Sequence, residues 1–199
     1  MSTSPTLKVL ILAGGKSRRM KQDKSLLSYK DGKPHPIYLA NLCTDLGYEV
    51  FLSRAKSEDD DFLYGIPVLK DRIEDIGPIA GLEAAFHQSG ESAWLLLACD
   101  LPFINRACIE HLMNNRDKTA LATIYQLPHK SMPEPLMAIY EPNIIPYLTN
   151  CIENKRYAFM CMLENEVIKR IPLEDAQQAF NVNTPEDYDQ ANALLDDHP

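Results

Sequence analysis

Short apolar runs recur along the chain, and glycine, proline or acidic residues follow several of them. The run from Leu7 to Ala13 stops at Gly14 and Gly15, and a short uninterrupted run of this kind fits a buried strand of a parallel sheet better than a helix. Similar runs predict strands over residues 49–54, 66–71, 93–100 and 120–127. The segments between them predict helices over residues 36–46, 78–88 and 106–115.

Strands that alternate with helix-length segments predict right-handed β-α-β crossovers, which build a mostly parallel sheet with helices on both faces. The later part is less regular, with strands expected over 135–140 and 167–173 and helices over 143–153 and 185–196. The expected fold class is therefore α/β, a Rossmann-like three-layer α/β/α arrangement. Ligands of such sheets bind beyond the carboxyl ends of the strands. We expect a disordered polar leader over 1–6 and a single domain over 7–199.

The chain of 199 residues is acidic, with 28 Asp and Glu against 20 Lys and Arg and a formal net charge of −8. Such a balance argues against nucleic-acid or anionic-membrane partners, because those are bound by basic residues that displace counterions. No apolar run approaches the ~20 residues that a membrane-spanning helix needs. The five cysteines are odd in number and form no C-x-x-C pair, so we expect a cytoplasmic protein whose cysteines are small, reduced core residues.

A basic, glycine-containing stretch follows the first predicted strand. Lys16, Arg18, Arg19, Lys21 and Lys24 all lie within it, directly after the two glycines. Glycines let the main chain approach a ligand, and the cations can neutralise phosphate oxygens, so a triphosphate is the expected guest. A solvated basic loop is the alternative. Neither the P-loop pattern G-x-x-x-x-G-K-S/T nor the dinucleotide pattern G-x-G-x-x-G is complete here.

A second candidate is Asp100, which ends the apolar run that begins at Trp94. Its carboxylate is expected at the carboxyl edge of the sheet, where the basic stretch also lies. Magnesium takes one or two protein carboxylates and completes its shell with water and substrate phosphates, so Asp100 is a candidate Mg²⁺ ligand. The alternative is that Asp100 caps the turn before the next helix, although Asn105 could fill that role.

Asp71 ends the 66–71 strand in the same way and is a candidate for reading a base. A carboxylate can accept from guanine N1–H and from its exocyclic amine. The structural alternative is pairing with Lys70 or Arg72.

Two asparagines, Asn181 and Asn183, precede the last predicted helix. Thr184 and Asp187 resemble a capping box, which explains those two residues without any ligand. The asparagine amides remain candidates for supporting a metal or a second substrate, and a purely structural turn is the alternative.

Five motifs follow one another along the chain and together carry a family resemblance. They are L-A-G-G-x-S-x-R-M-x-x-D-K at 12–24, G-P-x-A-G at 77–81, C-D-L-P at 99–102, P-L-x-A-x-Y at 135–140 and N-x-N-T-P-E-D at 181–187. In this order they resemble the molybdenum cofactor guanylyltransferases, the MobA-like branch of the nucleotidyltransferases with a GT-A-like fold. The resemblance implies transfer of GMP from Mg-GTP to the phosphate of molybdopterin (the molybdenum cofactor), which releases pyrophosphate and forms molybdopterin guanine dinucleotide. Molybdoenzymes or other cofactor-biosynthesis proteins are possible further partners.

The resemblance also implies roles for individual residues. Arg19, Lys24 and Asp100 would be catalytic, with Asp100 holding Mg²⁺ and the two cations offsetting the repulsion between the anionic substrates. The expected nucleotide-binding residues are Leu12, Ala13, Gly14, Gly15, Lys24, Ser53, Asp71 and Asp100. The chain departs from the family pattern at Lys21, where glycine is usual, and at Ser53, where some members carry asparagine.

Two other classes of function stay open at this point. One is a different nucleotidyltransferase, either a CTP-dependent molybdopterin cytidylyltransferase or a sugar-phosphate enzyme. Gly15 favours the guanine branch, because the cytidine-using relatives usually carry alanine at the second position of the pair. The other class is a module that carries the cofactor without catalysis.

Overall fold

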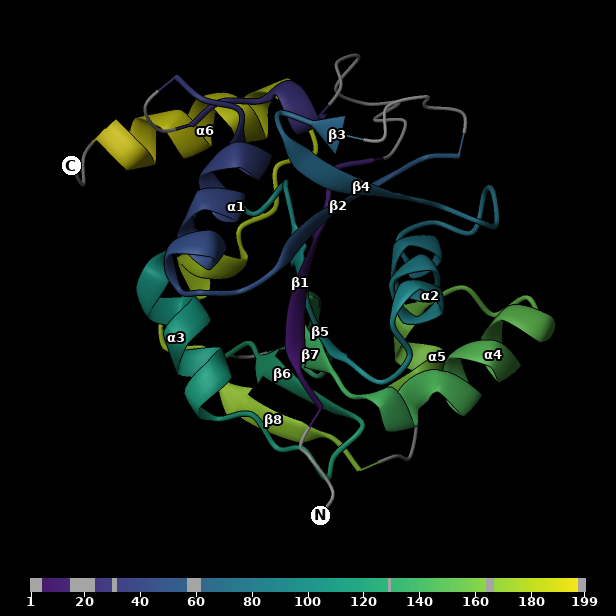
Figure 1. Cartoon of the computed structure of the whole chain (residues 1–199). Helices are drawn as coiled ribbons and strands as arrows, with labels where there is room; N and C mark the ends of the chain where they lie inside the picture. The colour runs from purple at the N-terminus through teal and green to yellow at the C-terminus, as the bar shows by residue number, and fades with distance from the viewer. Residues whose placement is uncertain are drawn as a thin grey trace.

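A computed structural model of the chain describes residues 5–14, 24–29, 32–56, 62–128, 130–163 and 167–196, with the main chain alone at positions 24 and 62. In this part an eight-stranded sheet lies between two layers of helices (Figure 1). The predicted three-layer α/β/α class is confirmed. The single-domain boundary over 7–199 and the disordered leader stay predictions, and of the leader only positions 5 and 6 are described.

The strands follow the order β3-β4-β2-β1-β5-β7-β6-β8 across the sheet. Their bounds are β1 Leu7–Leu12, β2 Val50–Arg54, β3 Phe62–Leu63, β4 Ile66–Lys70, β5 Ala93–Ala98, β6 Ala122–Gln126, β7 Glu134–Tyr140 and β8 Lys169–Pro172. Six of these described strands run in one direction, and β3 and β7 run against them. All the predicted strands are present, with ends that shift by about two residues at most. The short strand β3 was not predicted.

Helices cover both faces of this sheet. Their bounds are α1 His35–Asp45, α2 Ile79–Gln88, α3 Arg106–Asn114, α4 Ile145–Glu153, α5 Phe159–Leu163 and α6 Pro185–Asp196, with shorter 3-10 turns η1 Lys24–Leu26, η2 Pro142–Ile144 and η3 Ala176–Ala179. In Figure 1, α1 and α3 lie on one side of the sheet, and α2, α4 and α5 lie on the other. The turns η1 and η3 and the short helix α5 were not predicted.

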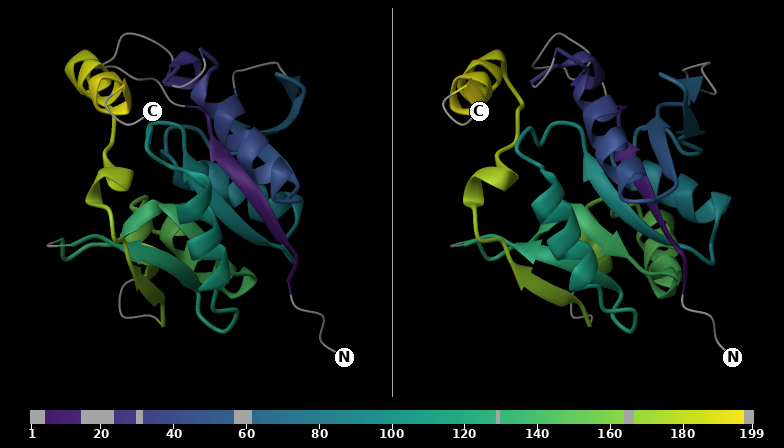
Figure 2. Two further views of the ribbon diagram at one scale, coloured as in Figure 1. Left: turned by 90° about the vertical axis from the view of Figure 1, so that its left-hand side faces the viewer. Right: turned by 60° about the vertical axis from the view of Figure 1, so that its left-hand side comes forward.

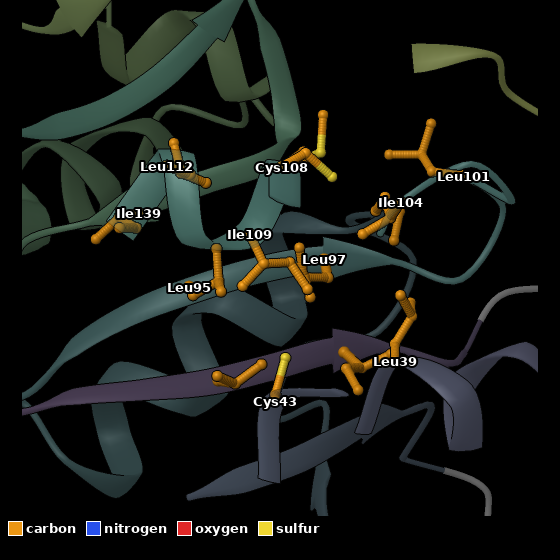
Figure 3. Packing of buried hydrophobic residues seen from close by; sticks show 14 of the residues in the cluster. Leu39, Cys43, Leu95, Leu97, Leu101, Ile104, Cys108, Ile109, Leu112 and Ile139 are labelled. Atoms are coloured by element: carbon orange, nitrogen blue, oxygen red, sulfur yellow. The ribbon is translucent and has the colours of Figure 1, made fainter. Parts of the chain in front are cut away.

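The alternation of side chains along β1 divides the core into two layers. Val9 and Ile11 pack with α1 and α3, whereas Leu10 and Leu12 pack with α2, α4 and α5. Strand β5 does the same, and Figure 3 shows Leu95 and Leu97 packed against the α1 and α3 side. Because both faces of β1 and β5 are buried, these strands are apolar at nearly every position, which is the pattern that predicts them.

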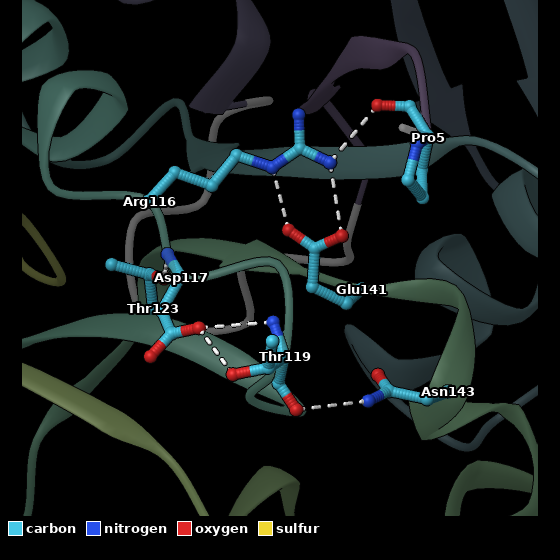
Figure 4. A network of polar contacts seen from close by, with 7 residues as sticks. All are labelled: Pro5, Arg116, Asp117, Thr119, Thr123, Glu141 and Asn143. Carbon is cyan, nitrogen blue, oxygen red and sulfur yellow. Dashed lines mark hydrogen bonds and ion pairs between the residues drawn. The ribbon is translucent and has the colours of Figure 1, made fainter. Parts of the chain in front are cut away.

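A buried ion pair fixes the end of the sheet from which β1 begins. Nε of Arg116 donates to Oε1 of Glu141 at 2.6 Å, and Nη2 donates to Oε2 at 2.9 Å (Figure 4). Nη2 also donates to the carbonyl oxygen of Pro5 at 3.1 Å. The pair therefore joins the α3–β6 connection, the residue that follows β7 and the segment that leads into β1.

The cysteines correct one expectation. Cys43, Cys99 and Cys108 are buried thiols outside any disulfide, as predicted, but Cys151 and Cys161 form a disulfide. The expectation that all five are reduced was wrong, because α4 and α5 pack together and bring their cysteines within reach, which no C-x-x-C spacing signals. None of the helices in the described ranges is long and apolar enough to cross a membrane.

Candidate active site

The four central parallel strands end at one edge of the sheet, and most of the predicted site residues lie there. The strands stand in the order β4-β2-β1-β5. Asp71 directly follows β4, Ser53 is the penultimate residue of β2, and Asp100 lies two residues beyond β5. Leu12, Ala13 and Gly14 leave β1 between them. The predicted meeting of the β1 end with Asp71 and Asp100 at one edge follows from this strand order.

The main chain that follows β1 is held on both sides. The Ala13 amide donates to the carbonyl of Ser53 at 3.1 Å, and the Cys99 amide donates to the carbonyl of Leu12 at 3.3 Å. At Gly14 a Cβ atom would stand 3.1 Å from the Ala55 nitrogen, closer than about nine in ten real contacts of that kind. Glycine therefore lets the chain that leaves β1 pass close to the end of β2, and Gly14 itself is exposed at this edge.

Asp71 is tied to β2 through both its side chain and its main chain. The Ser53 hydroxyl donates to Oδ1 of Asp71 at 3.1 Å, and the Asp71 amide donates to the carbonyl of Arg54 at 2.9 Å. Ser53 is only 3% exposed, whereas Asp71 is partly exposed. Arg72, one of the alternative partners, binds Glu83 at 2.6 Å. The carboxylate is thus oriented by a buried hydroxyl at the rim of the sheet.

Gly81 of α2 packs against the same strand ends. A Cβ atom at this position would stand 2.5 Å from Oγ of Ser53 and 2.8 Å from Cδ2 of Leu12. The glycine of the G-P-x-A-G motif therefore lets α2 approach the strands, and its nearest neighbours are protein atoms. This contact explains the motif without a direct contact to a ligand.

Asp100 lies beside the N-x-N motif, which returns from the far end of the chain. The Val182 amide donates to the carbonyl of Asp100 at 2.9 Å, and Oδ1 of Asn181 is buried without a hydrogen-bond partner in the described part of the structure. Asn105, rather than Asp100, caps α3, since its Oδ1 accepts from the Cys108 amide at 3.0 Å. The capping alternative for Asp100 is therefore not needed.

The second asparagine, Asn183, lies in the cap of α6. The Asn183 and Thr184 amides both donate to Oδ2 of Asp187 at 2.9 Å, and the Asp187 amide donates to Oγ1 of Thr184 at 3.2 Å. The predicted capping box is confirmed. The two asparagines thus differ, since only Asn181 presents a buried amide oxygen that accepts no hydrogen bond within the described ranges.

Helix α6 also closes the side of the site near residue 29. The Tyr188 hydroxyl donates to the carbonyl of Ser28 at 2.8 Å, and the rings of Tyr188 and Tyr29 lie 5.3 Å apart. Figure 2 shows α6 beside the segment that leads into α1. The Tyr29 hydroxyl is buried, and burial together with the negative charge of Asp100 raises its pKa well above the usual range. Tyr29 therefore stays protonated next to Asp100.

Glu134 is a further acid at this edge that the sequence interpretation missed. It begins β7, which runs against β5 with Leu97 opposite Met137, so the start of β7 lies at the end of β5 that leads to Asp100. Burial raises the pKa of Glu134, the charge of Asp100 raises it further, and the hydrogen bond from the Leu136 amide opposes this rise. The signal in the sequence that could have indicated Glu134 is its place immediately before the P-L-x-A-x-Y motif.

The residues at this edge fit a magnesium ion by the chemistry of their donors. Asp100 offers a carboxylate, and Asn181 offers a buried amide oxygen that accepts no hydrogen bond among the described residues. Among those residues no cluster of three or more His, Cys, Asp or Glu side chains could hold a metal by itself. One carboxylate suffices for Mg²⁺ when substrate phosphates and water complete the shell, so the donor set suits a metal that arrives with a nucleotide.

Part of the predicted phosphate site lies outside the described residues. This applies to Gly15, Arg19, Lys21 and the side chain of Lys24, whereas the main chain of Lys24 begins η1. Arg54, which was not predicted, contacts described residues on either side of that segment. Its Nη1 donates to the carbonyl of Ala13 at 2.9 Å and to Oγ of Ser25 at 2.8 Å. No sequence motif marks Arg54.

The family model described as the MobA-like NTP transferase domain matches residues 9–168. The chain belongs to this family. It is accordingly a nucleotidyltransferase, and the resemblance that its motifs carry is confirmed.

Individual relatives agree with this assignment. The chain is 34% identical to the molybdenum cofactor biosynthesis bifunctional protein of Synechocystis over 92% of its own length, and it spans 53% of that protein, about half. It is 32% identical to the probable molybdenum cofactor guanylyltransferase of Carboxydothermus hydrogenoformans, and the match covers 92% of this chain and 94% of that one.

Two solved structures share the fold. The molybdopterin-guanine dinucleotide biosynthesis protein A of Archaeoglobus fulgidus superimposes with a TM-score of 0.80 at 24% identity, over 96% of this chain and 99% of that chain. The CMP:2-keto-3-deoxy-manno-octonic acid synthetase complexed with CTP gives a TM-score of 0.76 at 14% identity, over 98% and 100%.

Proposed function

We propose that this nucleotidyltransferase moves GMP from Mg-GTP to the phosphate of molybdopterin, which releases pyrophosphate and forms molybdopterin guanine dinucleotide. The observation that supports the proposal is that two acids, the proposed base reader and the proposed metal ligand, lie on either side of the main chain that leaves β1. Asp71 stands at the end of β4, Asp100 follows β5, and residues 12–14 pass between the two. Relatives that carry the name molybdenum cofactor guanylyltransferase support the choice of both substrates.

The base would be read by Asp71. A carboxylate accepts the N1–H and 2-amino donors of guanine together. Adenine and cytosine each place an amine beside an acceptor ring nitrogen, so neither base offers this pair of adjacent donors. The hydrogen bond from Ser53 holds Oδ1 of Asp71 in one orientation, so the carboxylate is set before the nucleotide arrives. Main-chain atoms of Leu12, Ala13 and Gly14 would contact the nucleotide beside it.

The phosphates would lie between the main chain that leaves β1 and Asp100. Asp100, with the amide oxygen of Asn181 near it, would hold Mg²⁺, and that ion would neutralise charge on the triphosphate. Lys24 and Arg19 are proposed to bind the phosphates from the other side. Asn183, whose main chain belongs to the α6 cap, would act only through the position of Asn181.

The reaction itself needs little help with protons. A phosphate monoester has a second pKa of about 6, so the terminal phosphate of the pterin is largely dianionic at neutral pH and needs no strong general base. One of its oxygens attacks the α-phosphorus of GTP, a new P–O bond forms, and the bond to the bridging oxygen of the β-phosphate breaks. The electron pair leaves with pyrophosphate. The task of the protein is to position two anions and to offset their repulsion.

The test is a pyrophosphate-release assay with the full chain, Mg²⁺, molybdopterin and each of GTP, CTP, ATP and UTP. We expect release only when GTP and molybdopterin are both present. Release with CTP in preference to GTP would replace guanylyl transfer by cytidylyl transfer, and binding of GTP without any release would make the protein a carrier. A cytoplasmic location and delivery to a molybdoenzyme are part of the same proposal.

A further inference from the structure

Arg54, the last residue of β2, joins two segments that lie on either side of the basic stretch in the sequence. Its Nη1 donates to the carbonyl of Ala13 at 2.9 Å and to the hydroxyl of Ser25 at 2.8 Å. Ala13 leaves β1, and Ser25 lies in η1 beside Lys24. One guanidinium nitrogen therefore fixes the distance between the chain that enters this stretch and the chain that leaves it.

The main chain of Arg54 makes two further contacts at the same edge. Its carbonyl accepts from the Asp71 amide at 2.9 Å, and its Cα would stand 3.2 Å from a Cβ atom placed on Gly14. Arg54 thus contacts the chain that leaves β1, the start of η1 and the main chain of Asp71. These contacts link the proposed base site to the proposed phosphate site.

The hydrogen bonds of the Arg54 guanidinium are suited to keeping Ala13 and Ser25 at a fixed separation. Ser25 is only 1% exposed, so its hydrogen bond to the guanidinium is shielded from water. The guanidinium is planar, always charged and able to serve several acceptors in fixed directions, whereas a lysine ammonium is a more flexible and more strongly hydrated point charge. A charged donor also makes a stronger hydrogen bond than a neutral one.

We propose that Arg54 is a positioning residue for the triphosphate, which acts by holding the chain at Ala13 and at Ser25 at a fixed separation. The proposal rests on the proposed function. Binding groups that are fixed before the ligand arrives lose less conformational freedom on binding, and this gain falls on the phosphate half of the nucleotide. The base half depends on the Asp71 carboxylate, which accepts the hydrogen bond of the Ser53 hydroxyl.

Three probes separate the two halves of the nucleotide. With Mg²⁺ present and the full chain in calorimetric titrations, Arg54→Met should raise the Kd of GTP and of inorganic tripolyphosphate about tenfold or more. The Kd of guanosine should stay within about twofold, since guanosine carries no phosphate. Arg170→Met is the matched control, because Arg170 donates to Oε1 of Gln126 at 3.0 Å on the exposed far strand β8, and it should leave all three values unchanged.

A merely structural role gives a different result. If Arg54→Met lowers the melting temperature but leaves the Kd of GTP and tripolyphosphate unchanged, or raises all three values equally, the proposal is overturned. Two milder variants address the case in which Arg54→Met does not fold. Ser25→Ala removes the Ser25 acceptor, and Arg54→Lys keeps the charge. Each variant should raise the Kd of tripolyphosphate severalfold more than the Kd of guanosine. Wild-type protein that binds no GTP would refute the proposed function itself.

Discussion

The hydroxyl of Ser53 and the carboxylate of Asp71 form a hydrogen bond of 3.1 Å that joins β2 to the end of β4. The donor is buried and the acceptor is partly exposed, so the contact sets the direction in which the carboxylate faces. Some family members carry asparagine at this position, whereas the serine of this chain orients the Asp71 carboxylate. A nucleotide-binding role for Ser53 is therefore proposed to be indirect.

Ser53→Ala should reduce selectivity for guanine more than it reduces overall binding. A hydrogen bond of this kind contributes about 0.5–1.5 kcal/mol, so the ratio of kcat/KM for GTP to that for ITP, which lacks the 2-amino group, should fall about two- to tenfold. Ser89→Ala is the control, since it removes a serine contact to Ser92 at the far end of α2. An unchanged ratio would show that Ser53 does not orient Asp71.

Gly81→Ala tests the close approach of α2 to the strand ends. The new Cβ atom would meet Oγ of Ser53 at 2.5 Å and Cδ2 of Leu12 at 2.8 Å, and overpacking of this kind costs about 1–3 kcal/mol. Urea unfolding should show this loss, and the GTP to ITP ratio should fall as in Ser53→Ala. Gly90→Ala is the control, because its nearest contact would be the Phe86 carbonyl at 3.3 Å. Equal stability of the two variants would contradict the packing argument.

Asp100→Asn should remove turnover and leave the fold intact. The substitution keeps the size of the side chain and its main-chain link to Val182, but it replaces the proposed ligand for Mg²⁺ by a neutral amide. We expect kcat for pyrophosphate release to fall at least about a hundredfold, with little change in the urea midpoint. An active Asp100→Asn enzyme would remove the role assigned to this carboxylate.

Glu134 should make folding stability depend on pH. Burial raises the pKa of its carboxyl, so the folded state holds this proton more tightly than the unfolded state does. Its contribution to stability is complete below the unfolded pKa and is lost as the pH rises through the folded pKa. In metal-free buffer, Glu134→Gln should therefore gain more stability relative to wild type near pH 8 than near pH 5. Equal differences in unfolding free energy at the two pH values would refute this.

The Arg116–Glu141 pair should be important for stability and not for selectivity. Its side chains are 9% and 1% exposed, and removal of one partner from a buried pair typically costs about 3–5 kcal/mol. Arg116→Met should lose about that much free energy of unfolding in urea. The exposed pair of Arg106 and Glu110, each 46% exposed, is the control, and Arg106→Met should cost less than about 1 kcal/mol.

The central part of the fold could be predicted because its signal is local. Strands β1 and β5 are buried on both faces, so their apolar runs are almost uninterrupted, and the end of each run places Gly14 and Asp100 correctly. The short elements β3 and α5 were missed because a few residues give no measurable period.

The site residues that were missed act through tertiary contacts. In the sequence nothing distinguishes Arg54 from other residues at the end of a strand, because its contacts are with β1 and η1. Glu134 approaches Asp100 because β7 runs antiparallel to β5. The pairing of Cys151 with Cys161 depends on how α4 meets α5. The roles of Gly15, Arg19 and Lys24 stay predictions, because the structure does not describe Gly15, Arg19 or the Lys24 side chain.

The bond between Tyr188 and Ser28 spans 160 positions of the sequence, and Val182 reaches back to Asp100 in the same manner. Strand β8 ends at Pro172, before either contact can form. During translation all the described strands of the sheet are therefore synthesised before Asn181. A nascent chain can therefore complete the described sheet while it still lacks Asn181, so the proposed support for the metal would be the last part of the site to be added.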